Sequence, residues 1–496
     1  MGKIYKQSLF SVILTFVGIA LGVAVTVLSV RYFPQEELGF TQNLIRISSL
    51  LSQCGVLGFH MALLIKGQSY KENLERRNAF FSYAFFSSLL GLSIITFLLL
   101  LFSNLVPNIY MEADKDLVRK YVLLFPFLTF LSGILLFLEA WLQGNHRTAT
   151  TTFSREILTR LLYIVLIFAY GFNYIDFSVF ITVYVLKHFI PLGYLLWKGR
   201  KEEKVKITSR FDLLRKEEKR HLWSFSNFHL FSILSLMLIH QMDILLLGPL
   251  SGLKDVAIYS VAALVVNMLR APMRAVATAI TPALSQHYHK KESNLLKNIF
   301  QISRINAQIY GVFMTGLIII NLTHIPYVLS LIHTGYDSVH IIVGILLIGQ
   351  FFEMTTGFNH ELIGVSNDYK VNFWLSIICA IIFIFLQYSF IIKWGIIGAA
   401  WATSIGFIIF NIAKSWFVFY RFKIKPIKKE GWYVILLGAT ITSVIIFIPI
   451  LFHPFIDLIL RSMLFLASYW FVCYKINIST QLNQFTHSIL KVFKLR

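Results

Sequence analysis

The chain consists of long apolar runs that alternate with short polar segments. A helix needs roughly 20 apolar residues to cross the hydrocarbon core of a bilayer, and the runs have about this length. The pattern therefore predicts an all-α polytopic membrane protein with 14 transmembrane helices. The predicted helices span residues 9–30, 40–65, 79–103, 118–143, 156–172, 176–197, 223–248, 256–285, 305–329, 339–363, 371–392, 395–420, 431–452 and 456–475.

Composition narrows the class of protein further. Hydrophobic residues make up 57% of the 496 residues and charged residues only 14%, with a mean hydropathy of +0.70. Soluble domains carry about a quarter charged residues, so a soluble enzyme, a disordered chain and a secreted disulfide scaffold are excluded. The three cysteines lie inside apolar runs without metal-ligand spacing, so we expect no metal and no cofactor.

The distribution of basic residues predicts the orientation. With the N-terminus inside, 32 of the 45 Lys and Arg residues fall in inner segments and 6 in outer ones. Cytoplasmic loops are enriched in Lys and Arg, so we expect both termini in the cytoplasm. The net charge of +21 therefore reflects topology, and no nucleic-acid partner is expected.

One basic linker and a weak internal repeat predict the domain organisation. Residues 198–222 form the densest charge run and separate a six-helix lobe at 1–197 from a second at 223–420. Residues 421–496 add helices 13 and 14 and a cytoplasmic tail. The turn at 31–40, after the first helix, resembles the turn at 248–259, after the seventh. Repeats of this kind are typical of secondary transporters.

Several motifs carry a resemblance to a known family. They are MDILLLG at 242–248, VAIYSVA at 256–262, TPALS at 281–285, KWGIIGAAWAT at 393–403 and PQEELGF at 34–40. With these motifs the chain resembles bacterial polysaccharide and O-antigen flippases, a branch of the multidrug/oligosaccharidyl-lipid/polysaccharide (MOP) exporter superfamily. The likeness covers nearly the whole chain, and its motifs are scaffold signatures shared across the superfamily.

The resemblance implies a function. Such a flippase moves a polyprenyl-pyrophosphate-linked oligosaccharide from the inner to the outer leaflet of the bacterial cytoplasmic (inner) membrane by alternating access. Its product would enter O-antigen, lipopolysaccharide, capsule or exopolysaccharide biosynthesis. The implied partners are this lipid, membrane lipid, a coupling proton or sodium ion and polysaccharide polymerase machinery.

Three alternatives use other chemistry or another substrate. A cation-coupled multidrug exporter shares the scaffold, although twelve spans and an acidic cavity are typical of it. A peptidoglycan lipid-precursor flippase shares the architecture. A glycan polymerase or ligase would need a large outer loop, which the predicted topology lacks. No phosphate-binding loop of an ATPase and no H-E-x-x-H motif occurs, so we predict a protein that is not an enzyme and has no catalytic residues.

Charges within predicted spans are the candidate substrate-binding residues, because a charge at mid-bilayer costs about 2.5–3.5 kcal/mol. Arg270 and Arg274 are four residues apart on one predicted helix face, with Asn267 three residues earlier. Pro272 is expected to kink this helix and free the carbonyl of Met268. Two guanidinium groups beside a kink favour a pyrophosphate. Alternatively, Arg274 pairs with an acid and has a structural role.

Two further cations are candidates in the N-terminal half. Arg46 either lines a cavity or extends its side chain to the outer surface, and Lys187 lies midway along its predicted span. Three other basic residues lie near predicted helix ends, where we expect their charges to reach the interface: Arg160, Lys414 and Arg461.

The acidic candidates for coupling or gating are Asp243 and Glu353. Either could carry a proton or pair with an arginine. Glu139 and Glu361 are predicted to be interfacial. The Asp114-Lys115-Asp116 stretch is expected to be a solvated outer loop.

Overall fold

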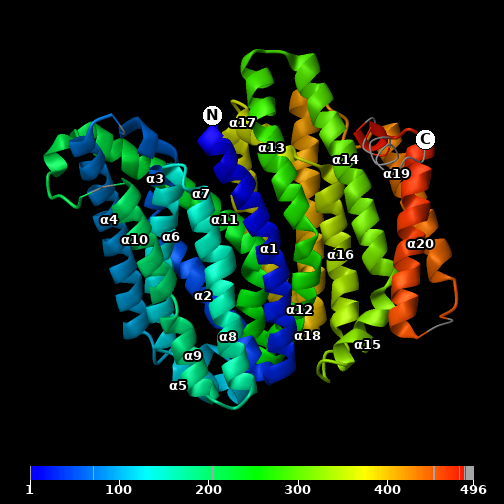
Figure 1. Ribbon diagram of the computed structural model, residues 1–496, viewed down its shortest axis with the longest axis horizontal. Coiled ribbons are helices and arrows are strands. Elements are labelled where there is room, and N and C mark those ends of the chain that lie inside the picture. The colour runs from blue at the N-terminus through cyan, green and yellow to red at the C-terminus, as the bar shows by residue number, and fades with distance from the viewer. Residues whose placement is uncertain are drawn as a thin grey trace. The chain divides into compact units, whose positions relative to one another are not determined.

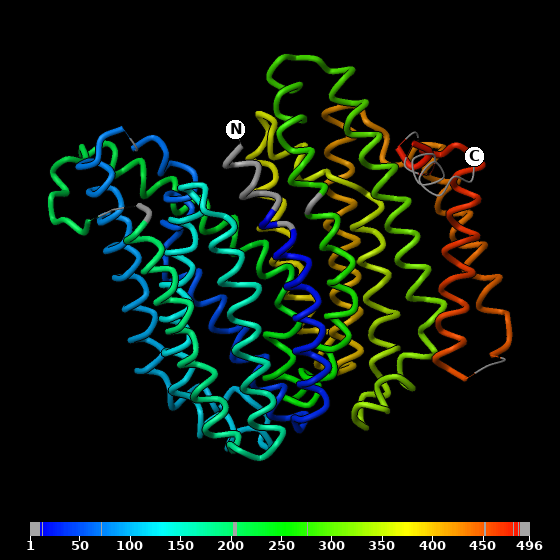
Figure 2. The backbone as a smooth tube through the Cα atoms, viewed as in Figure 1, coloured from blue at the N-terminus to red at the C-terminus, as the bar shows by residue number. Residues whose placement is uncertain are grey.

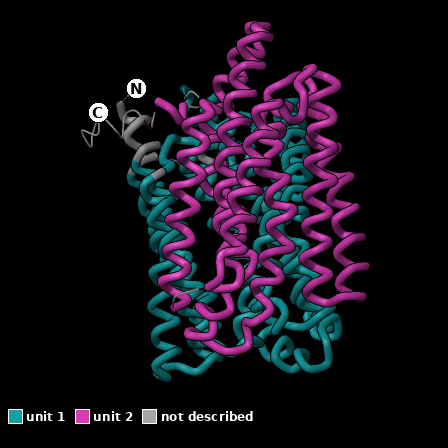
Figure 3. The backbone as a smooth tube through the Cα atoms, turned by 90° about the vertical axis from the view of Figure 1, so that its right-hand side faces the viewer, with its two compact units in different colours: residues 1–260 teal, residues 261–496 magenta. Residues whose placement is uncertain are grey.

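A computed structural model describes residues 2–70, 72–203, 206–450, 453–479, 481–484 and 486. These residues form helices and connecting turns, and no strand occurs among them. The predicted all-α fold class is confirmed. The chain divides into two compact units, Met1–Ser260 and Val261–Arg496 (Figure 3). The predicted tail beyond residue 486, parts of the predicted linker and the end of the span at 431–452 lie outside the described residues.

Unit 1 consists mainly of long helices, several of which run side by side (Figure 1). α6 contacts α2, α3, α4 and α10, so it is central to the packing of this unit. The helices are α1 (Gly2–Tyr32), α2 (Gln35–Gly55), α3 (Phe59–Lys66), α4 (Leu74–Leu101), α5 (Lys115–Tyr121), α6 (Leu124–Gly144), α7 (Thr148–Thr152), α8 (Thr159–Gly171), α9 (Phe177–Leu186), α10 (Phe189–Glu203) and α11 (Lys216–Ser251). Short 3₁₀ and π turns connect them: η1 (Gly67–Tyr70), η2 (Val106–Ile109), η3 (Glu112–Asp114), η4 (Phe153–Leu158) and η5 (Phe211–Leu213).

Unit 2 begins within α12 and ends with a helical hairpin of α19 and α20, which packs on α14 (Figure 2). The α14–α19–α20 core contains the buried side chains of Val434, Phe465 and Tyr469. Its helices are α12 (Leu253–Met268), α13 (Arg270–His289), α14 (Ser293–Ile320), α15 (Ile325–Ser330), α16 (Val339–Thr356), α17 (Asn359–Val365), α18 (Tyr369–Phe422), α19 (Lys429–Ile446) and α20 (Pro454–Lys475), with the short turn η6 (Leu322–His324).

The number of membrane spans can be compared with the prediction. In the described part of the chain, ten helices are long and apolar enough to cross a membrane, or twelve if two bent pairs are counted. The 54 residues of α18 cover two predicted spans, and a straight helix of that length would be about 80 Å long. Within α18, Gly395 has non-helical backbone angles (φ 54°, ψ −134°) and lies at the predicted boundary between these two spans. The count of fourteen, like the predicted lobe boundaries, stays a prediction.

The predicted continuous helix at 40–65 is wrong in one respect. α2 and α3 meet at a bend of 68°. The backbone at Leu57 and Gly58 has positive φ values of 53° and 73°, which a continuing helix does not allow. A Cβ at Gly58 would lie 2.1 Å from the carbonyl oxygen of Ser226 on α11, so only glycine permits this close approach.

Three charged side chains are buried where the sequence predicted exposure. Lys414 and Arg461 were expected to reach the interface, but both are only 6% exposed. Arg461 binds Asp457 and donates to the carbonyls of Ile445 and Ile448, which satisfies its guanidinium inside the α19–α20 hairpin. Asp114 was expected in a solvated loop.

Asp114 instead connects two parts of unit 1. It is 6% exposed and accepts a hydrogen bond from the backbone N–H of Leu253, at the start of α12, at 2.9 Å. The first N–H groups of a helix have no partner within the helix, so an acid at this position stabilises it. Burial raises the pKa of Asp114, and the hydrogen bond from Leu253 partly offsets this shift.

Candidate functional site

In unit 1, Lys187 lies at a break between two helices. α9 ends at Leu186 and α10 begins at Phe189. Pro191 has no N–H for the carbonyl of Lys187, and its ring would clash with that carbonyl in a regular helix. The N–H of Ile190 donates to the Lys187 carbonyl instead, at 3.0 Å. Proline thus explains why the helix opens at this lysine.

The ammonium group of Lys187 is enclosed by aromatic rings. It lies 3.9 Å from the ring centroid of Tyr184 and 4.4 Å from that of Tyr163, and the residue is 5% exposed. Its hydrogen-bond acceptor is the carbonyl of Thr159, at 3.5 Å. Within the described residues, no carboxylate lies within 4.0 Å of it. The predicted role of Lys187 in substrate contact would therefore require the tyrosine rings to move.

Arg46 on α2 belongs to the same group of side chains. It interacts electrostatically with Tyr184 and with Asp243. Its Nε is buried and has no hydrogen-bond partner among the described residues. We call Arg46, Tyr163, Tyr184 and Lys187 the unit 1 cluster. It holds two cations, of which Lys187 lies against aromatic rings and Arg46 interacts with the nearby carboxylate of Asp243.

Asp243 on α11 is engaged with its own surroundings. Its carboxylate accepts hydrogen bonds from the hydroxyl of Tyr259 at 2.7 Å and from the backbone N–H of Ile244 at 2.8 Å. Nearby, Asn43 on α2 donates to the carbonyl of Ile244 and accepts from the hydroxyl of Tyr110. These bonds connect α2 to α11 and are compatible with the structural alternative for Asp243. The role of Asp243 in coupling or gating stays a prediction.

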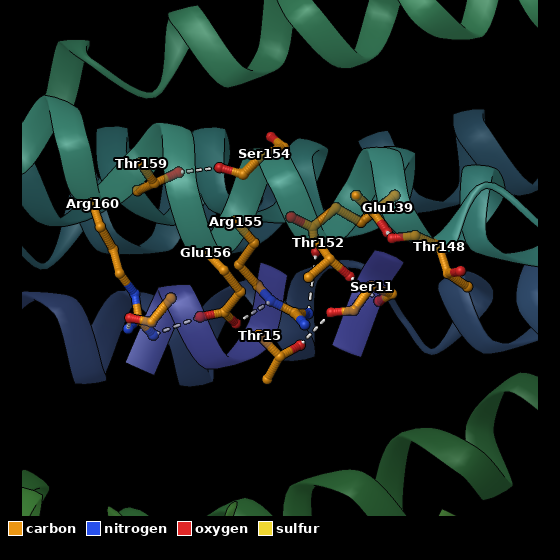
Figure 4. Close-up of polar contacts among 12 residues, drawn as sticks. Ser11, Thr15, Glu139, Thr148, Thr152, Ser154, Arg155, Glu156, Thr159 and Arg160 are labelled. Carbon is orange, nitrogen blue, oxygen red and sulfur yellow. Dashed lines mark hydrogen bonds and ion pairs between the residues drawn. The ribbon is translucent and has the colours of Figure 1, made fainter. Parts of the chain in front are cut away.

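A second polar group in unit 1 contains cations that have acidic partners (Figure 4). Arg160 on α8 contacts Glu156 on η4 at 2.6 Å, and Arg155 lies 3.2 Å from Glu156 and 3.6 Å from Glu139. Arg160 also donates to the carbonyl of Gly18 on α1. The two cations of this network thus have two carboxylate partners.

In unit 2, the region around Pro272 is broken as predicted. α12 ends at Met268 and α13 begins at Arg270, with a bend of 47°. The hydroxyl of Tyr310 donates to the carbonyl of Leu269 at 3.1 Å, so a side chain occupies one backbone acceptor at the break. The predicted alignment of Asn267 with Arg270 on one helix face stays a prediction.

Arg270 pairs with Glu353, one of the two predicted coupling acids. Its guanidinium lies 2.9 Å from Oε1 of Glu353 on α16 and 5.8 Å from the ring centroid of Phe407 on α18. Arg274 and Asn267 are exposed. The structure thus pairs Arg270 with an acid, and whether Arg274 and Asn267 bind substrate stays a prediction.

Sequence reasoning missed the part that Lys414 plays beside this pair. Its ammonium lies 3.5 Å from the ring centroid of Phe410 and interacts electrostatically with Glu353, Glu361 and Arg270. We call Arg270, Glu353, Glu361 and Lys414 the unit 2 cluster. The spacing of Phe407, Phe410 and Lys414, three and four residues apart, was the available signal, because it puts them on one face of α18.

Several solved structures share this fold. The lipid II flippase MurJ in an inward closed conformation matches with a TM-score of 0.74 and 17% identity, covering 95% of this chain and 99% of that chain. An inward-facing multidrug resistance MATE transporter of the MOP superfamily matches with a TM-score of 0.65 and 12% identity, covering 86% and 95%. A MOP superfamily transporter from Pyrococcus furiosus has a TM-score of 0.56 and 15% identity, covering 89% and 96%. No curated protein sequence matches the chain.

With its long apolar helices, the chain is a multi-pass membrane protein that shares its fold with these structures. Two family profiles match the sequence: one described as polysaccharide biosynthesis protein at residues 4–288, and one described as MatE at residues 229–391. The first covers more than half of the 496 residues, and the chain belongs to the polysaccharide biosynthesis protein family. This confirms the resemblance found in the motifs.

Proposed function

We propose that the protein is a flippase for a polyprenyl-pyrophosphate-linked oligosaccharide. It moves this lipid from the inner to the outer leaflet of a bacterial cytoplasmic membrane by alternating access, for the synthesis of O-antigen, capsule or another surface polysaccharide. Both termini lie in the cytoplasm in this proposal. Membership in the polysaccharide biosynthesis family supports the substrate class, and the fold supports a transport mechanism.

The unit 1 cluster is the observation that carries the proposal. Two cations within membrane helices are retained there at a cost of about 2.5–3.5 kcal/mol each. The neighbours of Lys187 are tyrosine rings, and Arg46 interacts electrostatically with Asp243 and Tyr184. The buried Nε of Arg46 is a hydrogen-bond donor without a partner in the described part of the chain. Asp243 is one carboxylate for two cations, and a diphosphate supplies further negative charge and acceptor oxygens.

In unit 2, the same substrate would have to compete with a carboxylate. Arg270 already binds Glu353, so a diphosphate that binds Arg270 displaces Glu353 or binds once Glu353 is protonated. Lys414 is the neighbouring cation that can receive the displaced carboxylate. This exchange would make Glu353 the coupling residue, and a proton the coupling ion.

The alternatives differ in substrate charge or in the attached sugar. A multidrug exporter for cationic drugs is disfavoured because the unit 1 cluster would repel its substrate. A peptidoglycan precursor flippase would handle the same diphosphate chemistry, and the fold similarity to MurJ favours keeping this candidate.

The proposal is tested in a deletion strain, by measuring the membrane sidedness of its lipid-linked glycans. The strain is complemented with wild type, Arg46→Ala, Arg270→Ala and, as a matched control, Arg155→Ala, which removes a cation with carboxylate partners. We expect inner-leaflet oligosaccharide to accumulate in the deletion, Arg46→Ala and Arg270→Ala strains only. Accumulation of peptidoglycan precursor would favour the second candidate. Drug sensitivity without any accumulated glycan would overturn the flippase proposal.

A further inference from the structure

Unit 2 contains a second cationic site, away from the unit 2 cluster, at one end of its helices. A cavity of about 540 Å³ opens where α13 ends, α14 begins and α18 ends. The turn between α13 and α14 can be followed in Figure 1. The cavity is lined by His287, Tyr288, His289, Lys291, Ser293, Leu296, Lys297, Asn367, Arg421, Phe422 and Lys423.

The charge of this cavity is strongly positive. Two of its basic residues have acidic partners outside the lining: His287 contacts Glu292 at 2.5 Å, and Arg421 contacts Asp368 at 2.6 Å. The three lysines of the lining form no ion pair within 4.0 Å among the described residues. We call Lys291, Lys297 and Lys423 the rim lysines. Three ammonium groups around one cavity attract a ligand with more than one negative charge.

Two of the rim lysines adopt a backbone conformation that is unusual for lysine. Lys291 has a φ of 58° and Lys423 a φ of 55°, each just after the end of a helix. Glycine or asparagine is the usual residue in this left-handed position, because a Cβ is strained there. Glycine at these two positions would remove the backbone strain, but it would also remove two positive charges from the cavity. Strained residues that converge on one cavity favour a binding role.

The other walls of the cavity are fixed by packing. The hydroxyl of Tyr288 accepts a hydrogen bond from the backbone N–H of Asn367 at 3.1 Å, and its ring packs edge-on against Phe422. Ser293, at the start of α14, lies in the lining, so the positive end of that helix faces the cavity. The site combines fixed aromatic groups with long, adaptable cations.

The depth of the site indicates what it binds. The second predicted span within α18 ends at residue 420, directly before Arg421 of the lining, so we place the cavity at the level of lipid headgroups. The excess of basic residues in the predicted inner segments assigns this end to the cytoplasmic leaflet. At that level the available polyanions include lipid phosphates. A phosphodiester headgroup carries one negative charge, whereas a lipid diphosphate carries more and matches three lysines better.

We propose that the rim lysines bind the diphosphate headgroup of a polyprenyl lipid at the cytoplasmic membrane surface. The site would capture the substrate before it enters the membrane helices. This inference rests on the proposed substrate class but concerns a different site from the intramembrane clusters. Its test is a binding measurement, so transport is not needed for the result.

The experiment measures binding to the purified full-length protein by native mass spectrometry with three probes. They are geranylgeranyl diphosphate, dioleoyl phosphatidylglycerol and inorganic pyrophosphate. The test variant carries Lys291→Gly and Lys423→Gly, which removes two charges while relieving the backbone. The matched control is Lys370→Gln, which removes one exposed cation outside the lining. A variant with Arg46→Ala separates binding at this site from binding at the unit 1 cluster.

We expect the double glycine variant to bind geranylgeranyl diphosphate roughly tenfold more weakly for each lysine removed. Its thermal stability should equal or exceed that of wild type, and Lys370→Gln should retain wild-type binding. The difference between the two variants should persist when both are made in an Arg46→Ala background, where binding at the unit 1 cluster is weakened. Wild-type binding by the double glycine variant, or an equal loss in Lys370→Gln, would overturn the site. Equal affinity for phosphatidylglycerol would overturn the preference for a diphosphate, and equal affinity for inorganic pyrophosphate would overturn the role of the lipid.

Discussion

The two units differ in how they hold charges inside their membrane helices. In unit 1, Lys187 lies against Tyr163 and Tyr184, whereas Arg46 interacts electrostatically with Asp243 and Tyr184. In unit 2, Arg270 pairs with Glu353, and Lys414 lies over the ring of Phe410 and interacts electrostatically with Glu353 and Glu361. When a buried cation has an acidic partner, removing either residue leaves an uncompensated charge and destabilises the protein. A buried cation among rings contributes little to stability, so its retention favours a functional explanation.

The largest expected effect is the loss of the Arg270–Glu353 pair. Arg270→Ala leaves Glu353 without its partner at 2.9 Å and should lower stability by about 3 kcal/mol. Adding Glu353→Gln removes the uncompensated charge and should restore most of the stability. Transport should be lost in both variants if Arg270 binds substrate. Thermal unfolding in detergent and glycan sidedness measure the two effects, and recovery of transport in the double variant would assign Arg270 a structural role.

The same substitution should have opposite effects on stability in the two units. Lys414→Met removes a cation that interacts with Glu353 and Glu361, and we expect a loss of about 2 kcal/mol. Lys187→Met removes a cation enclosed by two rings and should be neutral or stabilising by about 1 kcal/mol, yet should impair transport. Thermal unfolding of the two variants side by side gives the answer. Equal destabilisation of the two variants would show that the two cations contribute equally to the free energy of unfolding, and would contradict the comparison.

A smaller effect is expected for a cation of unit 1 that has acidic partners. The side chain of Arg155 is 55% exposed and lies near Glu139 and Glu156 (Figure 4). Exposed ion pairs contribute about 1 kcal/mol or less, so Arg155→Met should change stability by no more than that and leave transport intact. Loss of transport in Arg155→Met would show that cations with acidic partners are also needed for transport, and would contradict the contrast with the unit 1 cluster.

The smallest effect concerns Asp114, which lies outside both clusters. Its raised pKa means that the folded state favours the protonated carboxyl, so its contribution to stability falls as the pH rises through that pKa. The stability of Asp114→Asn should therefore rise relative to that of wild type between pH 4 and pH 7. Melting temperatures at the two pH values measure this. A relative loss at pH 7 would show that the charged form contributes to the contact with Leu253.

The sequence predicts the all-helical fold well because apolar runs of this length have one stable arrangement in a bilayer. It also predicts the break beside Pro272, since proline acts through its own backbone. The bend at Gly58 was not predicted, because it depends on the approach of α11, which is distant in sequence.

The candidate residues divide in the same way. Intramembrane cations such as Arg46 and Arg270 can be found by their position within apolar runs. Their partners cannot, because Glu353 comes from a helix more than 80 residues away and Lys414 depends on the packing of α18. The burial of Arg461 likewise depends on backbone carbonyls at the end of α19, which accept its hydrogen bonds. The sequence around Arg461 does not reveal these acceptors, because they lie on another helix.

The central claim is that the unit 1 cluster serves transport rather than stability. In its most direct test, wild type, Lys187→Met and Arg46→Lys are reconstituted in proteoliposomes. The movement of a polyprenyl-diphosphate oligosaccharide between the two leaflets is then measured. The account predicts rapid movement for wild type, partial activity for Arg46→Lys and a loss for Lys187→Met in a protein at least as stable as wild type. Full activity of Lys187→Met would contradict it.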